Sequence, residues 1–543
     1  MSLLTICIAS LAVLMGHDAL AEQPRGYSIP MVDLAWDWER QTTVDQEPGQ
    51  YLGHPTTVLL EDGTTILCVY PKGHGRGAVV YKRSTDGGLT WSDRLPTPEN
   101  WSTSKETPTI HRVIDPKDGT RRLIMFSGLY PIRMAVSEDD GASWSALEPI
   151  GDWGGIVAMG DVVRLKDGRY AAYFHDDGRF FRNGGRATGT MTLYQTISND
   201  GGLTWGEPEI IYASSDVHLC EPGLVRSPDG ARLAMLLREN RRVRNAHVMF
   251  SDDESATWSE PAELPGALTG DRHTARYLPD GRLFISFRDT THESKTQGDW
   301  VGWLGTWEDI AEGREGQCRV RLMDNHHRWD CAYPGVEVLP DGTIVTTTYG
   351  HWTPGESPYI VSVRLHADEL DAWMDRRTVT LRGKPMHLEG QPVRLGEIAP
   401  DFVVVDTSMQ ERRLTDYRGK TIVISVAPSL DTGVCAAQTR AFNERATALG
   451  DDVVILTVTL DLPMAQARWC GANGVDRVET LSDYRYWSFA EAFGLRMREN
   501  GLLARAVYVL DSWGVVRYEQ IVEELTTEPD YDAAFKAVSA LVD

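Results

Sequence analysis

The chain has 543 residues, too many for one ordinary hydrophobic core, so its length predicts two or more domains. A hydrophobic content of 42% is normal for globular proteins, so each domain can bury a core of its own. The formal net charge of -24 excludes nucleic acids and anionic membrane surfaces as expected partners, because both would repel the protein.

The first predicted element is a secretory signal peptide over residues 1–21. An apolar run over residues 4–15 precedes Ala19-Leu20-Ala21, a small-residue cleavage pattern, and the run is too short to span a bilayer. We therefore expect export to the periplasm or out of the cell. The alternative is a misplaced start codon and a cytoplasmic protein.

Seven cysteines are present, and loss of Cys7 with the signal leaves an even number, which fits an oxidising compartment. Cys318 and Cys331 are close in sequence and are candidates for a bridge. A pairing of Cys68 with Cys220 is a second candidate that spacing alone does not decide.

A turn motif recurs between residues 84 and 258. The pattern S-x-D-x-G-x-[ST]-W covers residues 84–91, 137–144 and 198–205, and a degenerate copy over 251–258 has Ser255 in place of the glycine. In such a hairpin turn the aspartate accepts hydrogen bonds from backbone N–H groups and the glycine adopts a positive φ. We expect the tryptophan to pack between neighbouring sheets.

Asp-Gly pairs mark the same repeat, at residues 62–63, 118–119, 167–168, 229–230, 280–281 and 341–342. Asp-Gly between alternating apolar runs is a strong signal for a hairpin. Six units of about four short strands each, with almost no helical periodicity, predict an all-β six-bladed propeller within residues 22–375.

The pattern changes after the last repeat. Residues 366–375 predict a short helix or turn, and the charged, Gly- and Pro-containing residues 376–392 predict a linker. Residues 393–543 predict an α/β domain with a mixed sheet and helices on both sides. Its expected strands are 421–427, 452–460, 504–510 and 515–522, and its expected helices are 434–449, 463–472 and 530–542.

The α/β domain contains a candidate reactive cysteine. Cys435 follows a predicted buried strand and lies in the first turn of a predicted helix. Free N–H groups and the positive end of the helix dipole stabilise a thiolate there, and a thiolate attacks a peroxide O–O bond. Thr432, one turn earlier, can donate a hydrogen bond to the sulfur and to a peroxide oxygen.

Residues 393–543 resemble the thiol peroxidases, an atypical 2-Cys branch of the peroxiredoxins. The resemblance rests on a P-x-x-x-T-x-x-C motif and on three shorter matches, at residues 395–402, 461–463 and 481–483. It implies a thioredoxin-like fold. It also implies a set of site residues, namely the peroxidatic Cys435, the shielding Pro428, the substrate-orienting Thr432, Arg505 from a later strand and the resolving Cys470.

The same resemblance implies the chemistry. Cys435 takes one oxygen from hydrogen peroxide or an organic hydroperoxide and becomes a sulfenic acid, while Thr432 and Arg505 stabilise the leaving oxygen. Cys470 then closes an intramolecular disulfide, which a thioredoxin-like protein reduces. No cofactor or metal is expected, and family members commonly form dimers. The alternative is a pair of ordinary buried thiols or a static disulfide.

The turn repeats resemble the Asp-boxes of the sialidase superfamily, which are structural and say little about activity. Around them, Glu221, Arg238 and Tyr333 resemble the base, a carboxylate-binding arginine and the nucleophile of sialidases. The first sialidase arginine and the acid aspartate are missing, and Arg272 and Arg288 are candidates for other arms of a carboxylate clamp. Residues 271–273 also fit a surface turn.

His54 and His74 lie one hairpin apart, an arrangement similar to that of propeller lyases acting on uronate-containing polysaccharides. A third interpretation is a glycan-binding module that localises the peroxidase, and a fourth is a fusion of two independent activities. Several tryptophans can stack on sugars or pack between blades, namely Trp300, Trp303, Trp307, Trp329 and Trp352.

Overall fold

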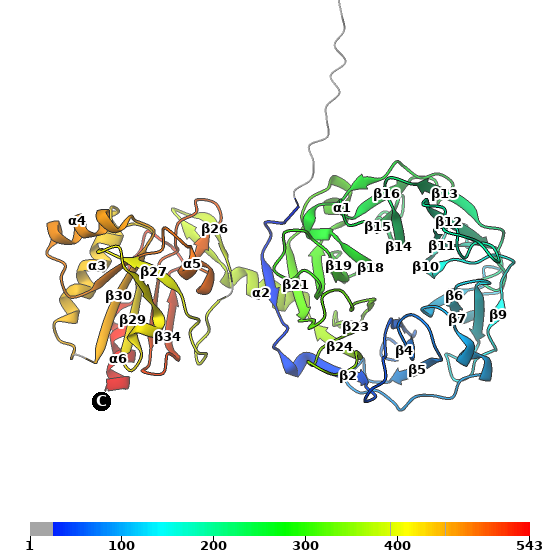
Figure 1. Ribbon diagram of the computed structural model, residues 1–543, viewed down its shortest axis with the longest axis horizontal. Helices are drawn as coiled ribbons and strands as arrows, with labels where there is room; N and C mark the ends of the chain where they lie inside the picture. The colour runs from blue at the N-terminus through cyan, green and yellow to red at the C-terminus, as the bar shows by residue number, and fades with distance from the viewer. Residues whose placement is uncertain (1–24, 391, 451, 543) are drawn as a thin grey trace, which may run out of the picture.

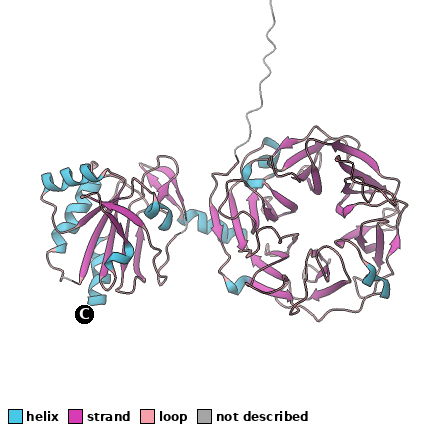
Figure 2. Cartoon of the chain, in the orientation of Figure 1, coloured by secondary structure: helices cyan, strands magenta, loops and turns pink. Residues whose placement is uncertain are grey.

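The computed structural model describes residues 25–390, 392–450 and 452–542. The predicted signal peptide lies outside the described residues. Figure 1 shows an N-terminal part built of sheets around a common centre and a C-terminal α/β part, joined through α2 (Ala367–Arg376). Strands dominate the first part and helices gather on the second (Figure 2). Within the described residues, no helix has the length and apolar character needed to cross a membrane.

The described residues of the N-terminal part form six small sheets. The first has β3 (Thr56–Leu59), β4 (Ile66–Pro71) and β5 (Val79–Ser84). The second has β6 (Thr109–Ile114), β7 (Arg121–Ser127), β8 (Arg133–Ser137) and β9 (Glu148–Pro149). The third has β10 (Ile156–Arg164), β11 (Tyr170–Asp176), β12 (Met191–Ser198) and β13 (Glu209–Ser214).

The fourth sheet has β14 (Leu219–Arg226), β15 (Leu233–Glu239), β16 (His247–Ser251) and β17 (Ala262–Glu263). The fifth has β18 (Gly270–Tyr277), β19 (Leu283–Asp289), β20 (Trp300–Gly305) and β21 (Cys318–Met323), with α1 (Trp307–Glu312) before β21. The sixth has β22 (Gly335–Val338), β23 (Ile344–Gly350) and β24 (Tyr359–Leu365). Two early strands complete these last sheets, β1 (Met31–Asp33) parallel to β21 and β2 (Gln41–Asp45) antiparallel to β24.

The six Asp-Gly pairs lie in the turns that join the first two strands of each sheet, as the sequence predicts. The repeated turn motif also has its expected geometry. In the second sheet, Asp139 accepts hydrogen bonds from the backbone and side chain of Ser143, and Gly141 has a φ of 76°. Trp144 packs against Tyr81 of the first sheet, so this tryptophan lies between neighbouring sheets as expected.

The C-terminal part is built on one mixed sheet, in the order β28-β27-β31-β30-β29-β33-β34. The strands are β27 (Val403–Asp406), β28 (Glu411–Arg413), β29 (Thr421–Val426), β30 (Val453–Thr459), β31 (Glu479–Ser482), β33 (Ala506–Leu510) and β34 (Val516–Ile521). The helices are α3 (Gly433–Ala446), α4 (Pro463–Asn473), α5 (Ser488–Ala492) and α6 (Tyr531–Val542). The predicted mixed sheet is confirmed, because β29, β30 and β31 are parallel while β33 is antiparallel to β29.

Two apolar layers cover the two faces of this sheet. Phe442 of α3 and Val538 of α6 belong to one layer, together with Val423 and Val509 of the sheet. Phe489 of α5 belongs to the other layer. The neighbouring strands β29 and β33 alternate their apolar residues between these layers, which is the pattern of a sheet buried on both faces.

The structure corrects the prediction that residues 376–392 form a linker. Residues within it form a hairpin of β25 (Thr378–Leu381) and β26 (Lys384–Glu389), and β26 pairs with β32 (Arg496–Met497) of the C-terminal part. Val379, Met386 and Leu388 are buried in the core of that part. The hairpin therefore belongs to the α/β domain, because its alternating apolar residues cover one end of that core.

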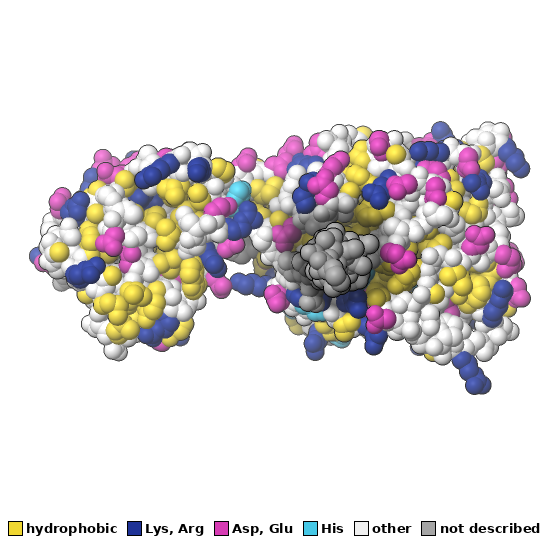
Figure 3. Space-filling model, turned by 90° about the horizontal axis from the view of Figure 1, so that it is seen from above, with side chains coloured by type: hydrophobic (Ala, Val, Ile, Leu, Met, Phe, Trp, Pro, Cys, Tyr) yellow, Lys and Arg dark blue, Asp and Glu magenta, His cyan; other side chains and the backbone are white. Residues whose placement is uncertain are grey.

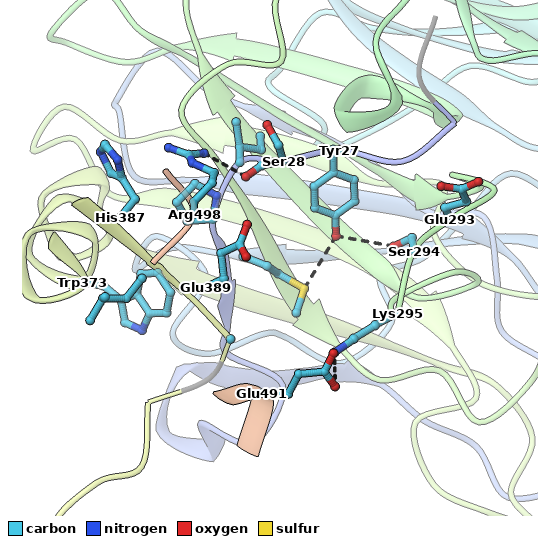
Figure 4. A pocket seen from close by; sticks show the side chains of 15 residues that line it. Tyr27, Ser28, Glu293, Ser294, Lys295, Trp373, His387, Glu389, Glu491 and Arg498 are labelled. Atoms are coloured by element: carbon cyan, nitrogen blue, oxygen red, sulfur yellow. Dashed lines mark hydrogen bonds and ion pairs between the residues drawn. The ribbon is translucent and has the colours of Figure 1, made fainter. Parts of the chain in front are cut away.

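A cleft of about 340 Å³ lies where the two parts meet (Figure 4). Arg498 donates a hydrogen bond to the carbonyl oxygen of Ser28 across this cleft, at 2.9 Å, and Lys295 lies 3.5 Å from Glu491. These contacts are few and polar, and Figure 3 shows the two parts as separate lobes. Each part therefore depends on its own core.

The cysteines form no bridge among the described residues. All six cysteines from Cys68 to Cys470 are free thiols, and five of them are buried. The candidate pairs of Cys318 with Cys331 and of Cys68 with Cys220 are therefore not bridged in this structure. The buried thiols of Cys68, Cys220 and Cys318 lie in separate strands, where they pack as small apolar side chains.

Candidate functional site

The thiol of Cys435 lies where β29 passes through a short loop into α3. Cys435 is the third residue of α3, and its side chain is fully buried. The first-turn N–H groups of a helix have no intrahelical acceptor, and they carry the positive end of the helix dipole. The sulfur therefore lies in an electropositive environment that favours negative charge.

Two side chains donate hydrogen bonds to this sulfur. The hydroxyl of Thr432 lies 2.8 Å from Cys435 Sγ, and Nη2 of Arg505 lies 3.3 Å from it. Thr432 is the N-cap residue of α3, yet its hydroxyl makes no capping bond to the helix backbone and instead contacts the sulfur. Arg505 directly precedes β33. The sheet therefore brings together Arg505 and Cys435, which are 70 residues apart in the sequence.

A glutamine that the sequence analysis missed holds the arginine. Gln438 is fully buried one turn after Cys435, and its Oε1 accepts a hydrogen bond from Arg505 Nη1. Its Nε2 donates to Ser425 Oγ at 2.8 Å, which fixes the amide orientation. The carbonyl oxygen of Leu525 accepts from Arg505 Nη2 at 2.9 Å. Gln438 could have been found in the sequence, because a residue three positions after Cys435 lies on the same face of a helix.

The loop before α3 is held by Asp461, which follows β30. Its carboxylate accepts hydrogen bonds from Ser429 Oγ and from the backbone N–H of Leu430, both at 2.7 Å. Pro428 is half-buried at the start of this loop. Asp461 therefore fixes the middle of the segment from Pro428 to Thr432.

Cys470 lies in α4, half-buried, with its sulfur 3.7 Å from Thr480 Oγ1. Burial raises the pKa of the Cys470 thiol. Both cysteines are free, so this structure has the dithiol form of the pair.

Comparison with known proteins supports the chemistry of this site. The Redoxin family model matches residues 394–535. A thiol peroxidase from Bacillus subtilis (strain 168) is 55% identical over 164 residues, which is 30% of this chain and 98% of that protein. A thiol peroxidase from Staphylococcus aureus (strain MRSA252) is 50% identical over 159 residues, which is 29% of this chain and 96% of that protein. Through its C-terminal part, the chain belongs to the thiol peroxidase family.

Two solved structures complete the comparison. A peroxiredoxin-like protein from Aquifex aeolicus is 38% identical, with a TM-score of 0.29, and the match covers 31% of this chain and 98% of that one. A protein of unknown function from Dyadobacter fermentans DSM 18053 is 17% identical, with a TM-score of 0.46, and covers 60% of this chain and 98% of that one. The Bacillus match is longer than the segment from residue 393 to the chain end, so the thiol peroxidase domain begins before residue 393.

A second group of candidate residues lines a depression of about 290 Å³ in the N-terminal part. Tyr333 donates a hydrogen bond to Glu221 Oε1 at 2.5 Å, and Arg238 Nη1 lies 2.7 Å from the same oxygen. Burial and the neighbouring Glu221 raise the pKa of Tyr333. Burial opposes ionisation of Glu221, but Arg238, the Tyr333 hydrogen bond and His175 together lower its pKa. The depression also contains a half-buried carboxylate that was not predicted from the sequence, that of Glu106.

Arg238 and Arg288, two of the arginines proposed as a carboxylate clamp, contact a carboxylate of the chain itself. Asp271 is fully buried and pairs with Arg288 at 2.5 Å, Arg242 at 2.8 Å and Arg238 at 3.1 Å. Asp271 and Glu221 supply two negative charges against the three positive charges of Arg238, Arg242 and Arg288, so these five side chains keep a net positive charge. Arg272 is buried in a different cavity, and residues 271–273 lie in β18 rather than in a surface turn.

The two histidines have different environments. His54 Nδ1 accepts a hydrogen bond from the backbone N–H of Gly75 at 3.1 Å, and its Nε2 lies 3.2 Å from the Tyr349 hydroxyl. Burial lowers the pKa of His54. His74 is exposed, with Nε2 3.4 Å from Asp330, and this contact raises the pKa of His74. His74 is therefore the better proton donor, while both nitrogens of His54 are engaged.

The backbone near the centre of the N-terminal part is strained in a repeated way. Five non-glycine residues with a positive φ lie at or just before the first strand of five of the six sheets, namely His54, Val157, Glu221, Arg272 and Ala332. Such strain persists only where the surroundings enforce it, and it concentrates at functional sites. The tryptophans Trp300 and Trp303 are fully buried, so they pack in the core and do not stack on sugars.

Proposed function

We propose that the C-terminal domain is a thiol peroxidase that uses Cys435 as its peroxidatic residue. The supporting observation is the pair of hydrogen bonds that Thr432 and Arg505 donate to a sulfur in the first turn of a helix. The thiolate attacks one peroxide oxygen, the O–O bond breaks, and the other oxygen leaves as water or an alcohol. Arg505 and Thr432 stabilise the charge that develops on the leaving oxygen.

The second half of the cycle uses Cys470. Its thiol condenses with the Cys435 sulfenic acid, which forms the S–S bond and releases water. A thioredoxin-like dithiol protein then reduces the disulfide by exchange. A homodimer is part of the proposal, because it is common in the family that the domain resembles.

The test uses the full chain with hydrogen peroxide, cumene hydroperoxide and a thioredoxin system. We expect Cys435→Ser to abolish turnover. Cys470→Ser should consume one equivalent of peroxide and accumulate a sulfenic acid that dimedone traps. Cys68→Ala, a buried thiol in the N-terminal part, is the control and should keep full activity. Sustained turnover by Cys470→Ser would contradict the resolving role.

We propose further that the N-terminal part is a six-bladed β-propeller of the sialidase type with a carbohydrate-directed site. The observation that favours this is the Tyr333–Glu221 pair, in which a carboxylate at 2.5 Å can take the phenol proton. His74 on the same depression can donate a proton. Arg238, Arg242 and Arg288 outnumber Asp271 and Glu221, which leaves positive charge for an acidic sugar, either a sialic acid or a uronate.

The full chain should be incubated with sialosides and with uronate polysaccharides, following released sialic acid and the ultraviolet absorbance of unsaturated uronate. Unsaturated uronate that disappears in Tyr333→Phe would support the lyase, and sialic acid release would support a glycosidase. Tyr130→Phe, which breaks a similar Tyr–carboxylate pair with Asp152 elsewhere in the ring, is the control. Glycan binding without turnover would identify a targeting module for the peroxidase.

A further inference from the structure

A cluster of two imidazoles and one carboxylate lies beside the depression, and its carboxylate is that of Asp330, the partner of His74. His327 and Asp330 belong to the loop between β21 and β22, and His351 directly follows β23. One potential ligand atom from each of the three lies within 4.8 Å of the other two. We propose that His327, Asp330 and His351 form a binding site for a divalent transition-metal ion.

The loop that carries the cluster is tied to the end of β23. The side chain of Asn325 accepts a hydrogen bond from the backbone N–H of His351 at 3.1 Å and donates one to the carbonyl oxygen of His327. The backbone N–H of His326 donates to the carbonyl oxygen of His351 at 3.0 Å. These bonds hold the two histidines next to each other, with ring centroids 4.6 Å apart. Metal binding therefore requires little further ordering of these side chains.

Two tyrosine hydroxyl groups orient the carboxylate of Asp330 from one side. Tyr51 and Tyr349 donate hydrogen bonds to Oδ1 of Asp330, at 2.7 and 3.1 Å. His351 Nε2 lies 2.9 Å from the other oxygen, Oδ2. Two ligands that are each about 2.1 Å from one ion are roughly 3 Å apart at an octahedral angle and about 3.4 Å apart at a tetrahedral angle, so this pair needs to separate only slightly to share a metal. The tyrosines supply the outer hydrogen bonds that ligating carboxylates normally have.

The ligand types decide the class of ion. Imidazole suits zinc, copper, nickel, cobalt and iron, whereas calcium and magnesium prefer oxygen ligands. Two histidines and one carboxylate leave coordination positions open, as in metal sites that bind a further ligand. His74, which lines the depression, lies 3.4 Å from Asp330, so the ion would border the depression. The binding itself does not depend on whether the N-terminal part is an enzyme.

The experiment titrates Zn²⁺ and Co²⁺ into the full chain after removal of metals with a chelator. Cys435→Ser and Cys470→Ser are present in every protein, because thiols also bind these ions. We expect one equivalent of metal to bind, with a rise in the unfolding temperature of the N-terminal part. Visible Co²⁺ absorption should lack the charge-transfer bands of thiolate ligands.

His327→Ala is the decisive variant, because His327 is exposed and its loss leaves the core intact. It should weaken binding by at least ten-fold, and His327→Ala with His351→Ala should abolish it. His326→Ala, an exposed histidine in the same loop, is the matched control and should bind as the parent does. Equal affinity in the double variant and the parent, or no binding by the parent, would refute the site and leave only a hydrogen-bonded cluster.

Discussion

The peroxidase site depends on how the Arg505 guanidinium is held. Arg505 is buried, and its donors go to the Cys435 sulfur, to the carbonyl oxygen of Leu525 and to the side-chain oxygen of Gln438. The amide of Gln438 is fixed in turn by Ser425. Gln438 touches no reacting atom, so it acts as a positioning residue through the arginine.

We expect Gln438→Met to slow the oxidation of Cys435 by about ten-fold, because a hydrogen bond to a charged group contributes about 1.5 kcal/mol or more. Stopped-flow measurement of a single turnover gives this rate separately from reduction by thioredoxin. Arg377→Met is the control. Arg377 is also buried in the C-terminal part, but it donates to the carbonyl oxygens of Gly390 and Gly494, outside the Cys435 site. Its loss should lower stability and leave the oxidation rate unchanged; equal slowing in both variants would show that Gln438 is only structural.

Among the structural elements, the degenerate turn over residues 251–258 departs most from its repeat. Ser255 has a φ of 74° where the other copies have glycine, a conformation that costs a non-glycine residue about 1–2 kcal/mol. Its hydroxyl nevertheless pairs with the hydroxyl of Tyr173 at 2.7 Å and with Oε1 of Gln195 at 2.5 Å, and both partners are buried. An unsatisfied buried polar group costs about 1–3 kcal/mol, so the hydrogen bonds outweigh the strain.

We therefore expect Ser255→Gly to lower the free energy of unfolding of the N-terminal part by about 1–3 kcal/mol, although it restores the motif. Urea denaturation followed by tryptophan fluorescence provides the measurement. Ser255→Ala loses the same hydrogen bonds without relief of strain, so it should be less stable than Ser255→Gly by about 1 kcal/mol. A Ser255→Gly protein that is more stable than the parent would show that the strain dominates.

Elements with a local signal were predictable from the sequence. The Asp-Gly turns need only neighbouring residues, and the helix that begins at Gly433 was predicted to within a few residues. Cys435 and Thr432 lie one turn apart, so their contact follows from the helix. The hairpin was missed because its Gly, Pro and charged residues suggested a linker, although Arg382 and Gly383 form a two-residue turn with positive φ between alternating apolar residues.

Long-range pairing was not predictable in the same way. Asp271 forms ion pairs with arginines from β15, from β19 and from the loop after β15. No periodicity in the sequence indicates that these elements converge. The cluster around Asp330 likewise joins a loop to the end of a strand and to Tyr51 from the beginning of the chain. The sequence therefore indicated which side chains were candidates, and the fold decided which of them already had partners.

At the scale of the whole molecule, the boundary of the peroxidase domain lies before the hairpin. Val379, Met386 and Leu388 are buried in the domain core, and burial of one such side chain contributes about 1.5–3 kcal/mol. Arg377 is also buried and donates to the carbonyl oxygens of Gly390 and Gly494. Without the hairpin, the core of the domain would lose apolar cover at one end.

We expect a chain of residues 377–543 to fold and to reduce peroxide at the rate of the full protein. A chain of residues 393–543 should lose about 4 kcal/mol or more of its free energy of unfolding, which is a large part of the stability of an ordinary domain. Urea denaturation followed by circular dichroism, together with peroxide turnover, compares the two. Leu388→Ala in the longer chain should give an intermediate stability, because it removes part of the same contact. Equal stability of the two chains would mean that the hairpin only connects the two parts of the molecule.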